Sequence, residues 1–247
     1  MAKTEILFGI HSVGEALKSF RREFVELFLS GDKDSRRLDK IAGMAEKRNV
    51  PVRRINAEKL KSLAGTDAHQ GVAARVGQYP FTGLSTLIGS GNKTRGPFVL
   101  LLDHIEDPQN LGAIIRTALC AGMNGIVIPK DRSAGPTPAV SRSSAGALEH
   151  MPVCRVTNLV NAIQQLKKDG LWILGLDRMG EMPLYATDLT GPLGIVIGGE
   201  DQGIRPLVKK NCDGLISIPQ TGGFNSLNAS VAAAVVMYEA FRQRRAL

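Results

Sequence analysis

Three segments in the second half of the chain carry residue types that could act on a ligand. The first, residues 107–118, reads DPQNLGAIIRTA. Asp107 can cap a helix that begins at Pro108, and this helix would carry Arg116. An arginine on a helix that follows a buried strand is well placed to hold a phosphate or a ribose. A surface salt bridge is the alternative explanation for Arg116.

The second segment, residues 197–203, reads IGGEDQG and follows an aliphatic stretch. Its glycines allow the backbone to turn sharply or to approach a ligand closely. The segment has neither the Lys-Ser/Thr pair of a P-loop nor the G-x-G-x-x-G spacing of dinucleotide sites, and Glu200 and Asp201 would repel phosphate. It therefore favours a ligand that is neutral or cationic there, such as an adenosine with a sulfonium. A plain tight turn would explain it equally well.

The third segment, residues 218–232, reads IPQTGGFNSLNASVA. Two glycines lead into a predicted helix, and Ser226, Asn228 and Ser230 are all residue types that cap helix starts. Capping explains one of them. Three such residues, followed by alanines that allow close packing, indicate a crowded place where another part of the chain passes nearby.

The elements around these segments predict a mostly parallel α/β sheet from Pro97 onward. Short aliphatic stretches bounded by Gly, Pro and Asp are typical of strands buried on both faces. Ligands of such sheets bind beyond the carboxyl ends of the strands, so the loops after the strands are the candidate sites. We expect strands at 98–102, 125–128, 153–156, 171–176, 193–197 and 215–218, and helices at 108–121, 158–169, 205–210 and from about 228.

Residues 1–76 predict a small α/β/α domain with a basic surface. This stretch holds 15 Lys and Arg against 10 Asp and Glu, a net charge of +5. Its four basic pairs favour contact with an RNA or DNA backbone, although a solvated helix face would explain any one of them. Residues 77–96 are rich in glycine and predict a flexible linker. We expect helices at 11–20, 35–48 and 57–64, and strands at 25–29, 50–55 and 71–76.

The composition is that of a folded protein with an anionic partner. Hydrophobic residues make up 43% and charged residues 22% of the 247 residues. The longest apolar run, residues 231–238, is too short for a membrane span, and the N-terminus lacks the apolar core of a secretory signal. Three scattered cysteines, and four histidines outside metal-ligand spacing, predict neither disulfides nor a metal site and favour the cytoplasm. The net charge of +8 favours nucleic acid as partner.

The three segments, in this order and spacing, resemble the SpoU/TrmH family of RNA ribose 2′-O-methyltransferases. The matching pieces are 107–118, 197–204 and 218–232, and residues 136–147 (PTPAVSRSSAGA) are similar to the variable helix region of that family. The resemblance runs from about Pro97 to the C-terminus. Near the N-terminus, FGIHSV at 8–13 and HQGVAARV at 69–76 resemble the substrate-binding domain of one branch, which includes the 23S ribosomal RNA guanosine 2′-O-methyltransferases.

This resemblance implies an α/β SPOUT methyltransferase domain at 97–247 with a deep trefoil knot in its C-terminal part. It implies a ribosomal-protein L30e-like RNA-binding domain at 1–76 and a homodimer with active sites near the interface. S-adenosylmethionine would lie bent in the knot, with no metal. The implied cofactor contacts are Gly198, Gly203, Ile218 and Leu227, largely through backbone groups, and the implied catalytic residues are Asn110, Arg116, Glu200, Ser226 and Asn228.

The implied reaction is in-line methyl transfer to a ribose 2′-oxygen. The implied acceptor is a guanosine of 23S ribosomal RNA, either in the RNA itself or in a ribosome assembly intermediate. Because a free arginine has a pKa above about 12, we expect Arg116 to orient the 2′-oxygen and stabilise developing negative charge rather than remove a proton. Asn110 would hold Arg116 or the ribose, and Glu200 would pair with Arg116 or contact the cofactor's cation. Ser226 and Asn228 would shape the loop and the helix start.

Three other functions fit part of the sequence. A transfer RNA ribose methyltransferase would share the three segments. An RNA-binding module that has lost turnover would share the fold, although intact motif residues in all three segments argue against it. A nucleotide-binding α/β enzyme would need a phosphate-binding fingerprint, which the sequence lacks. Asp201, where relatives often carry Gly, and the bulky Phe224 depart from the family pattern and bear on how the RNA base is held.

Overall fold

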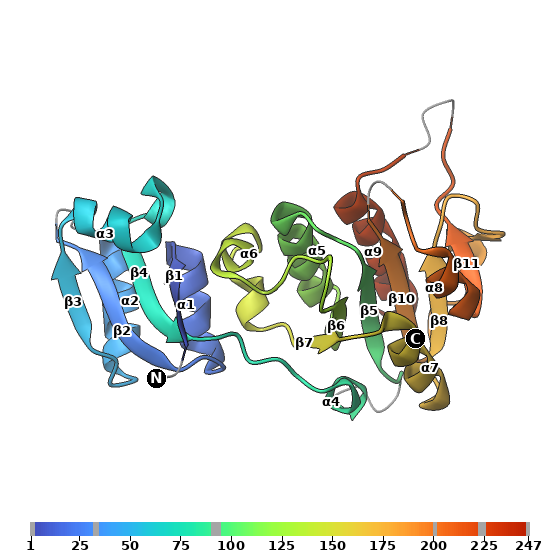
Figure 1. Cartoon of the computed structure of the whole chain (residues 1–247), viewed down its shortest axis with the longest axis horizontal. Helices are drawn as coiled ribbons and strands as arrows, with labels where there is room; N and C mark the ends of the chain where they lie inside the picture. Colours follow the sequence, from blue (N-terminus) through green and yellow to red (C-terminus); the bar gives the residue numbers. More distant parts are fainter. Residues whose placement is uncertain (1–2, 32–34, 90–94, 200–201, 222–225, 246–247) are drawn as a thin grey trace. The chain divides into compact units, whose positions relative to one another are not determined.

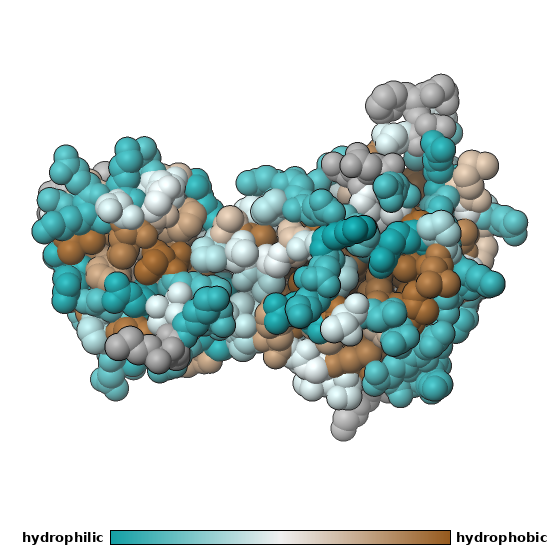
Figure 2. Space-filling model, in the orientation of Figure 1, coloured by the Kyte–Doolittle hydropathy of each residue, from teal (hydrophilic) through white to brown (hydrophobic). Residues whose placement is uncertain are grey.

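The computed structural model describes residues 3–31, 35–89, 95–199, 202–221 and 226–245. The chain forms two compact units, both drawn in Figure 1. The first unit contains residues 1–80 and 136–150, and the second contains residues 81–135 and 151–247. Hydrophilic residues cover much of the face seen in Figure 2, with hydrophobic residues in groups between them. Within the described ranges, no helix is long and apolar enough to cross a membrane.

The first unit holds a four-stranded sheet between two layers of helix. Its elements are β1 (Thr4–Phe8), α1 (Ile10–Ser19), β2 (Phe24–Ser30), α2 (Arg36–Glu46), β3 (Val52–Ile55), α3 (Ala57–Ala64), β4 (Val72–Gly77) and α6 (Pro138–Ser143). The strand order is β1-β4-β2-β3, and β4 is antiparallel to both of its neighbours. Successive strand residues point to opposite faces. Leu27 and Leu29 therefore face the core that α1 and α2 cover, while Phe28 packs with Leu60 of α3.

The second unit holds a seven-stranded sheet in which every pair of neighbouring strands is parallel. The order is β7-β6-β5-β10-β8-β11-β9. The strands are β5 (Phe98–Asp103), β6 (Gly125–Pro129), β7 (Val153–Val156), β8 (Trp172–Leu176), β9 (Met182–Pro183), β10 (Leu193–Gly198) and β11 (Gly214–Ser217). All residues of β5 and β6 are buried, as expected of central parallel strands covered on both faces.

Helices cover the sheet of the second unit. They are α4 (Leu84–Gly89), α5 (Pro108–Cys120), α7 (Leu159–Lys168), α8 (Pro206–Asn211) and α9 (Ala229–Arg245). Helices α4, α7 and α8 contribute Leu87, Ile163 and Val208 to one buried aliphatic core. Helix α5 packs against α9, and the two run beside each other in Figure 1. Every helix and strand expected from the sequence is present within two residues of its predicted limits.

The compact units differ from the predicted domains in two places. The predicted linker, residues 77–96, contains helix α4, whose Leu87 is fully buried. A side chain at Gly125 would collide with Leu87, so this helix is packed closely on the end of β6. The sequence did not predict this helix because the stretch is rich in glycine and one buried leucine, Leu87, anchors the helix. The second difference is residues 136–150, which lie in the first unit although the family resemblance placed them in the methyltransferase domain.

A buried ion pair explains why residues 136–150 belong to the first unit. The guanidinium of Arg22 donates from Nε to Oε2 of Glu149 at 2.8 Å, and both side chains are fully buried. Arg22 also donates from Nη1 to Glu5 at 2.7 Å. A buried charge needs such partners, because desolvation without them costs several kcal/mol. The pair joins positions 127 residues apart, and no local sequence pattern announces it.

Candidate functional site

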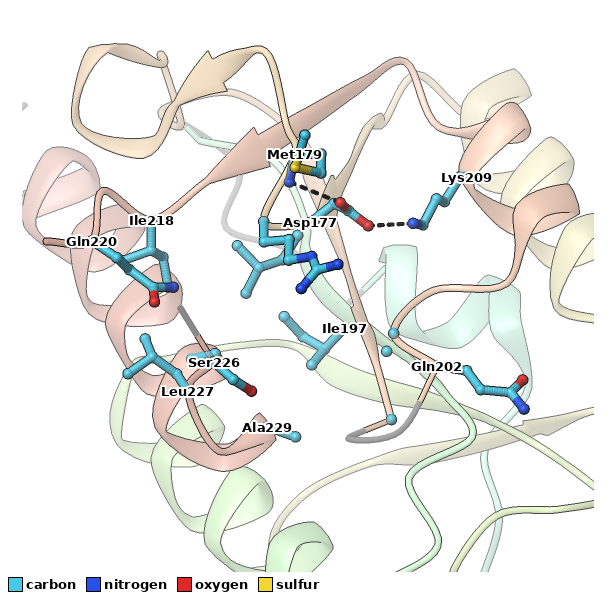
Figure 3. Close-up of a pocket in the computed structure, with 16 residues that line it drawn as sticks. Asp177, Met179, Ile197, Gln202, Lys209, Ile218, Gln220, Ser226, Leu227 and Ala229 are labelled. Atoms are coloured by element: carbon cyan, nitrogen blue, oxygen red, sulfur yellow. Dashed lines mark hydrogen bonds and ion pairs between the residues drawn. The ribbon is translucent and has the colours of Figure 1, made fainter. Parts of the chain in front are cut away.

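A pocket of about 400 Å³ opens at the carboxyl ends of β8, β10 and β11 (Figure 3). Its walls come from the loop after β8, from the end of β10 with the residues that follow it, and from the segment between β11 and α9. The four residues that the sequence assigns to a cofactor all line it: Gly198, Gly203, Ile218 and Leu227. The structure thus brings these residues together, and their contact with a cofactor stays a prediction.

Backbone rather than side chains forms the part of the pocket around Gly198. A Cβ atom on Gly198 would collide with the backbone of Gly203, and one on Gly199 with the carbonyl of His104. Gly203 has a φ of 61°, in the left-handed region that favours glycine. Its N–H donates to the carbonyl of Gly199 at 3.0 Å, which closes a tight turn. The backbone can approach this closely because Gly198 and Gly199 have no side chain, as predicted for these glycines.

A buried carboxylate fixes the residues that follow this turn. Asp103, at the end of β5, is fully buried and accepts three hydrogen bonds or ion contacts from Arg205. The backbone N–H of Arg205 lies 2.9 Å from Oδ2, and Nε and Nη2 each lie 2.8 Å from Oδ1. The carbonyl of Asp103 also accepts from the N–H of Gly199 at 2.9 Å. Asp103 therefore binds Gly199, at one end of the turn, and Arg205, two residues beyond its other end.

The loop after β8 adds a second carboxylate, which sequence reasoning missed. Asp177 forms an ion pair with Lys209 of α8 and accepts from the N–H of Met179 at 2.9 Å (Figure 3). Burial alone would raise the pKa of Asp177, but the pair with Lys209 and the Met179 hydrogen bond outweigh it and hold this pKa below its ordinary value. The rule that ligands bind after parallel strands could have found this loop, since a strand was predicted up to 176.

The first and third segments meet through two asparagines. Asn228 donates from Nδ2 to Oδ1 of Asn110 at 3.0 Å. The Oδ1 atom of Asn228 also accepts from the N–H of Ser230 at 2.9 Å and caps the start of α9. Asn110 is buried at the start of α5, where its N–H donates to the capping carboxylate of Asp107 at 3.2 Å. Asn110 was expected to hold Arg116 or a ribose, and here its carbonyl oxygen accepts from Asn228.

The other predicted catalytic residues occupy different positions. Arg116 is exposed on α5, and its side chain has no hydrogen bond or ion pair among the described residues. Ser226 lines the pocket beside Leu227. Glu200, Asp201 and Phe224 lie outside the described residues. In the described part of the chain, no group of three His, Cys, Asp or Glu residues could hold a metal ion.

Comparison with models of protein families shows which family the chain belongs to. The model of the SpoU rRNA Methylase family matches residues 97–238. The chain belongs to this family. A second model, RNA 2′-O ribose methyltransferase substrate binding, matches residues 6–82. The SpoU match covers all three segments and the whole pocket.

Several relatives in the SpoU family match along nearly their full length. The 23S rRNA (guanosine-2′-O-)-methyltransferase RlmB of Shewanella oneidensis is 40% identical over 99% of this chain and 100% of its own. RlmB of Escherichia coli K12 is 37% identical over 98% of this chain and 99% of its own. Among solved structures, the SpoU methyltransferase AviRb of Streptomyces viridochromogenes in complex with AdoMet superposes with a TM-score of 0.83 at 25% identity, covering 99% of this chain and 92% of that one.

The residues present fit S-adenosylmethionine, the cofactor of the SpoU family. Ile197, Ile218 and Leu227 give the pocket apolar surface for an adenine ring, and the backbone at Gly198 can approach it closely. The Asp177 carboxylate also lines the pocket, where it is paired with Lys209. The pocket is also large enough, at about 400 Å³, for a ligand of this class.

Proposed function

We propose that this chain transfers the methyl group of S-adenosylmethionine to the ribose 2′-hydroxyl of a guanosine in 23S ribosomal RNA. The observation that carries the proposal is that all four residues assigned to the cofactor from the sequence line one pocket. The RNA and the nucleotide are taken from the RlmB relatives, which match along nearly the whole chain. A transfer RNA substrate would keep the same chemistry and is an outcome of the test that closes the Discussion.

The residues of the pocket bind and orient the donor. S-adenosylmethionine supplies a methyl group made electrophilic by its sulfonium. Gly198, Gly199 and Gly203 offer backbone groups to the adenosine, and Asp103 binds the backbone at Gly199 and at Arg205.

Arg116 acts on the acceptor rather than on the donor. It lies outside the pocket lining, on α5, the helix whose first turn is tied to α9 through Asn110 and Asn228. Its guanidinium donates hydrogen bonds to the 2′-oxygen and a neighbouring phosphate. These bonds hold the 2′-oxygen in line with the methyl group and stabilise the negative charge that develops on it as the hydroxyl proton is released to solvent.

A substitution at Arg116 tests this assignment. We expect Arg116→Ala to lower methyl transfer by roughly 100-fold or more, as loss of one charge-stabilising donor does in other enzymes. The Kd for S-adenosylmethionine, measured by calorimetry, should stay within twofold because Arg116 does not line the pocket. Lys168→Ala removes an exposed charge at the far end of α7 and should retain activity. Equal loss of transfer and of cofactor binding in Arg116→Ala would show that Arg116 is structural.

Several finer features belong to the same proposal. The deep trefoil knot is part of the proposal because the chain belongs to the SpoU family. A homodimer is supported by exposed apolar side chains at the start of α9 and along it: Leu227, Val231 and Tyr238 are 39–49% exposed. Sedimentation or light scattering will give the mass in solution. We also propose a cytoplasmic location.

Residues 1–76 are proposed as an RNA-binding domain of L30e-like type. Phe20 is 71% exposed, and the guanidinium of Arg48 lies 4.3 Å from the centre of its ring. An exposed aromatic ring beside a guanidinium is a surface on which an unpaired RNA base can stack. The family model for substrate binding matches this same stretch.

A further inference from the structure

A second pocket, of about 320 Å³, opens at the carboxyl ends of β5, β6 and β7. We call it the strand-end pocket. His104 follows β5, Arg132 follows β6 and Thr157 follows β7, while α8 closes it with Arg205, Leu207 and Val208. None of these residues has a role in the reaction as described above, except that Arg205 also binds Asp103.

The strand-end pocket is next to the cofactor pocket. Gly203 lines the cofactor pocket and Arg205 lines the strand-end pocket, only two positions along the chain. Val208 likewise lines the strand-end pocket, and the next residue, Lys209, lines the cofactor pocket. The two pockets are centred on β6 and β8, three strands apart in the sheet, and strands lie about 4.8 Å apart, which gives about 14 Å between them. Stacked nucleotides rise by about 3.4 Å per step, so a strand with its acceptor ribose at the cofactor pocket reaches this pocket within about four nucleotides.

The lining of the strand-end pocket fits a nucleotide better than a free phosphate. Leu207, which is 62% exposed, gives it apolar surface on which a base can lie. Arg132 has no ion pair among the described residues, and Arg205 uses Nε and Nη2, but not Nη1, on Asp103. These donors suit phosphate and base oxygens. The carboxylate of Asp131 would repel a phosphate alone but accepts hydrogen bonds from base N–H groups.

The backbone around the strand-end pocket is held in an uncommon conformation. His104 and Arg132 have φ values of 62° and 51°, and in the described part of the second unit they are the only non-glycine residues in the left-handed region. Such conformations persist only where surrounding structure fixes them, and they gather at ligand sites. The N–H of Ala134 donates to the carbonyl of Ile105 at 2.8 Å and so joins the two loops that carry them.

We propose that the strand-end pocket holds one nucleotide of the RNA substrate, within about four nucleotides of the one that is methylated. The inference rests on the proposed function, because it takes its distance from the methyl acceptor. The base lies on the apolar side chain of Leu207, and Arg132 contacts its phosphate or its edge. The pocket then selects the acceptor by its neighbour in the RNA.

Photo-crosslinking of the full chain tests the proposal. A benzophenone amino acid replaces Leu207, whose exposed side chain can be changed without opening the core. The probe is the RNA transcript in which the unmodified chain places its methyl group, mapped separately. We expect crosslinks at nucleotides within about four of the methylated one, and none there from the same amino acid at Lys168. With methyl transfer intact, no crosslink from position 207, or crosslinks only at more distant nucleotides, would overturn the inference.

The two proposals fail in different ways. If the unmodified chain methylates no RNA, the proposed function falls and the inference falls with it. If it methylates RNA but position 207 crosslinks elsewhere, only the inference falls. Kinetics supply a second measurement: Arg132→Ala should raise the KM for RNA roughly tenfold, as loss of one base contact does. Its kcat and its Kd for S-adenosylmethionine should change less than twofold.

Lys130→Ala is the matched control, because Lys130 is an exposed cation two residues earlier that does not line the pocket. Its KM for RNA should rise less than threefold. An equal rise in KM for Arg132→Ala and Lys130→Ala would mean that only diffuse charge is being measured, and would overturn the inference.

Discussion

Asp103→Asn should loosen the turn at the cofactor pocket and lower both stability and cofactor affinity. The Asp103 carboxylate is fully buried and binds the backbone N–H, Nε and Nη2 of Arg205. An asparagine keeps one oxygen acceptor and places an NH₂ group against a donor of Arg205. At least one charge-assisted hydrogen bond is lost, at about 1.5–3 kcal/mol, together with the ion pair. We expect a total loss of about 3 kcal/mol.

Two measurements follow from this estimate. For a unit of this size, 3 kcal/mol corresponds to a fall in Tm of about 6–12 °C. Because the loosened turn must be ordered again when the cofactor binds, we expect about half of the energy to reappear as a roughly tenfold rise in the Kd for S-adenosylmethionine. Differential scanning calorimetry gives the first quantity and titration calorimetry the second.

The matched control is Asp169→Asn, which removes a carboxylate from an exposed position after α7. It should change Tm by less than 2 °C and leave the Kd for S-adenosylmethionine unchanged. If Asp103→Asn behaves in the same way, the buried carboxylate does not hold the turn. A lowered Tm with an unchanged Kd would show that Asp103 stabilises the unit without shaping the pocket.

Three further predictions concern other parts of the chain. Glu149→Ala leaves the buried Arg22 with one carboxylate partner fewer and should cost about 2–4 kcal/mol of unfolding free energy in urea titrations, against about zero for the exposed Glu58→Ala. Burial raises the pKa of Cys212 to about 11, so at pH 8 about one thiol in a thousand is ionised, and mass spectrometry should find iodoacetamide on the exposed Cys120 first; equal labelling rates would contradict the burial. RNA affinity should fall by about 0.7–0.9 log units per log unit of salt for each phosphate contacted, and insensitivity to salt would exclude the electrostatic contribution of the +8 charge.

The helices and strands could be predicted because their signals are local. Central strands such as β5 and β10 are continuous aliphatic runs, which only a sheet covered on both faces can bury. The start of α5 was equally clear, since Asp107 accepts from the N–H groups of Gln109 and Asn110 at 3.0 and 3.2 Å, as a capping residue should. The resemblance then indicated which loops meet, and the residues from β10 and the segment after β11 do share one pocket.

What the sequence could not provide depends on residues far apart in the chain. Arg22 and Glu149 are 127 positions apart, and Asp103 and Arg205 are 102 apart, so no window of sequence shows either pair. Strand β1 was missed because five residues near the N-terminus give a weak signal until their pairing with β4 is known. The strand-end pocket needs three loops at one edge of the sheet, an order of strands that local patterns do not reveal.

The most direct test of the account is methyl transfer itself. The chain is incubated with labelled S-adenosylmethionine and, separately, with total ribosomal RNA, assembling ribosomal particles and total transfer RNA, and the products are digested to nucleosides. The account predicts 2′-O-methylguanosine in 23S ribosomal RNA, free or in particles, and roughly 100-fold less, or lower still, with Arg116→Ala. Label in transfer RNA alone would keep the chemistry and contradict the substrate. No label in any of the three, with S-adenosylmethionine still bound, would contradict the central claim that this pocket serves methyl transfer to RNA.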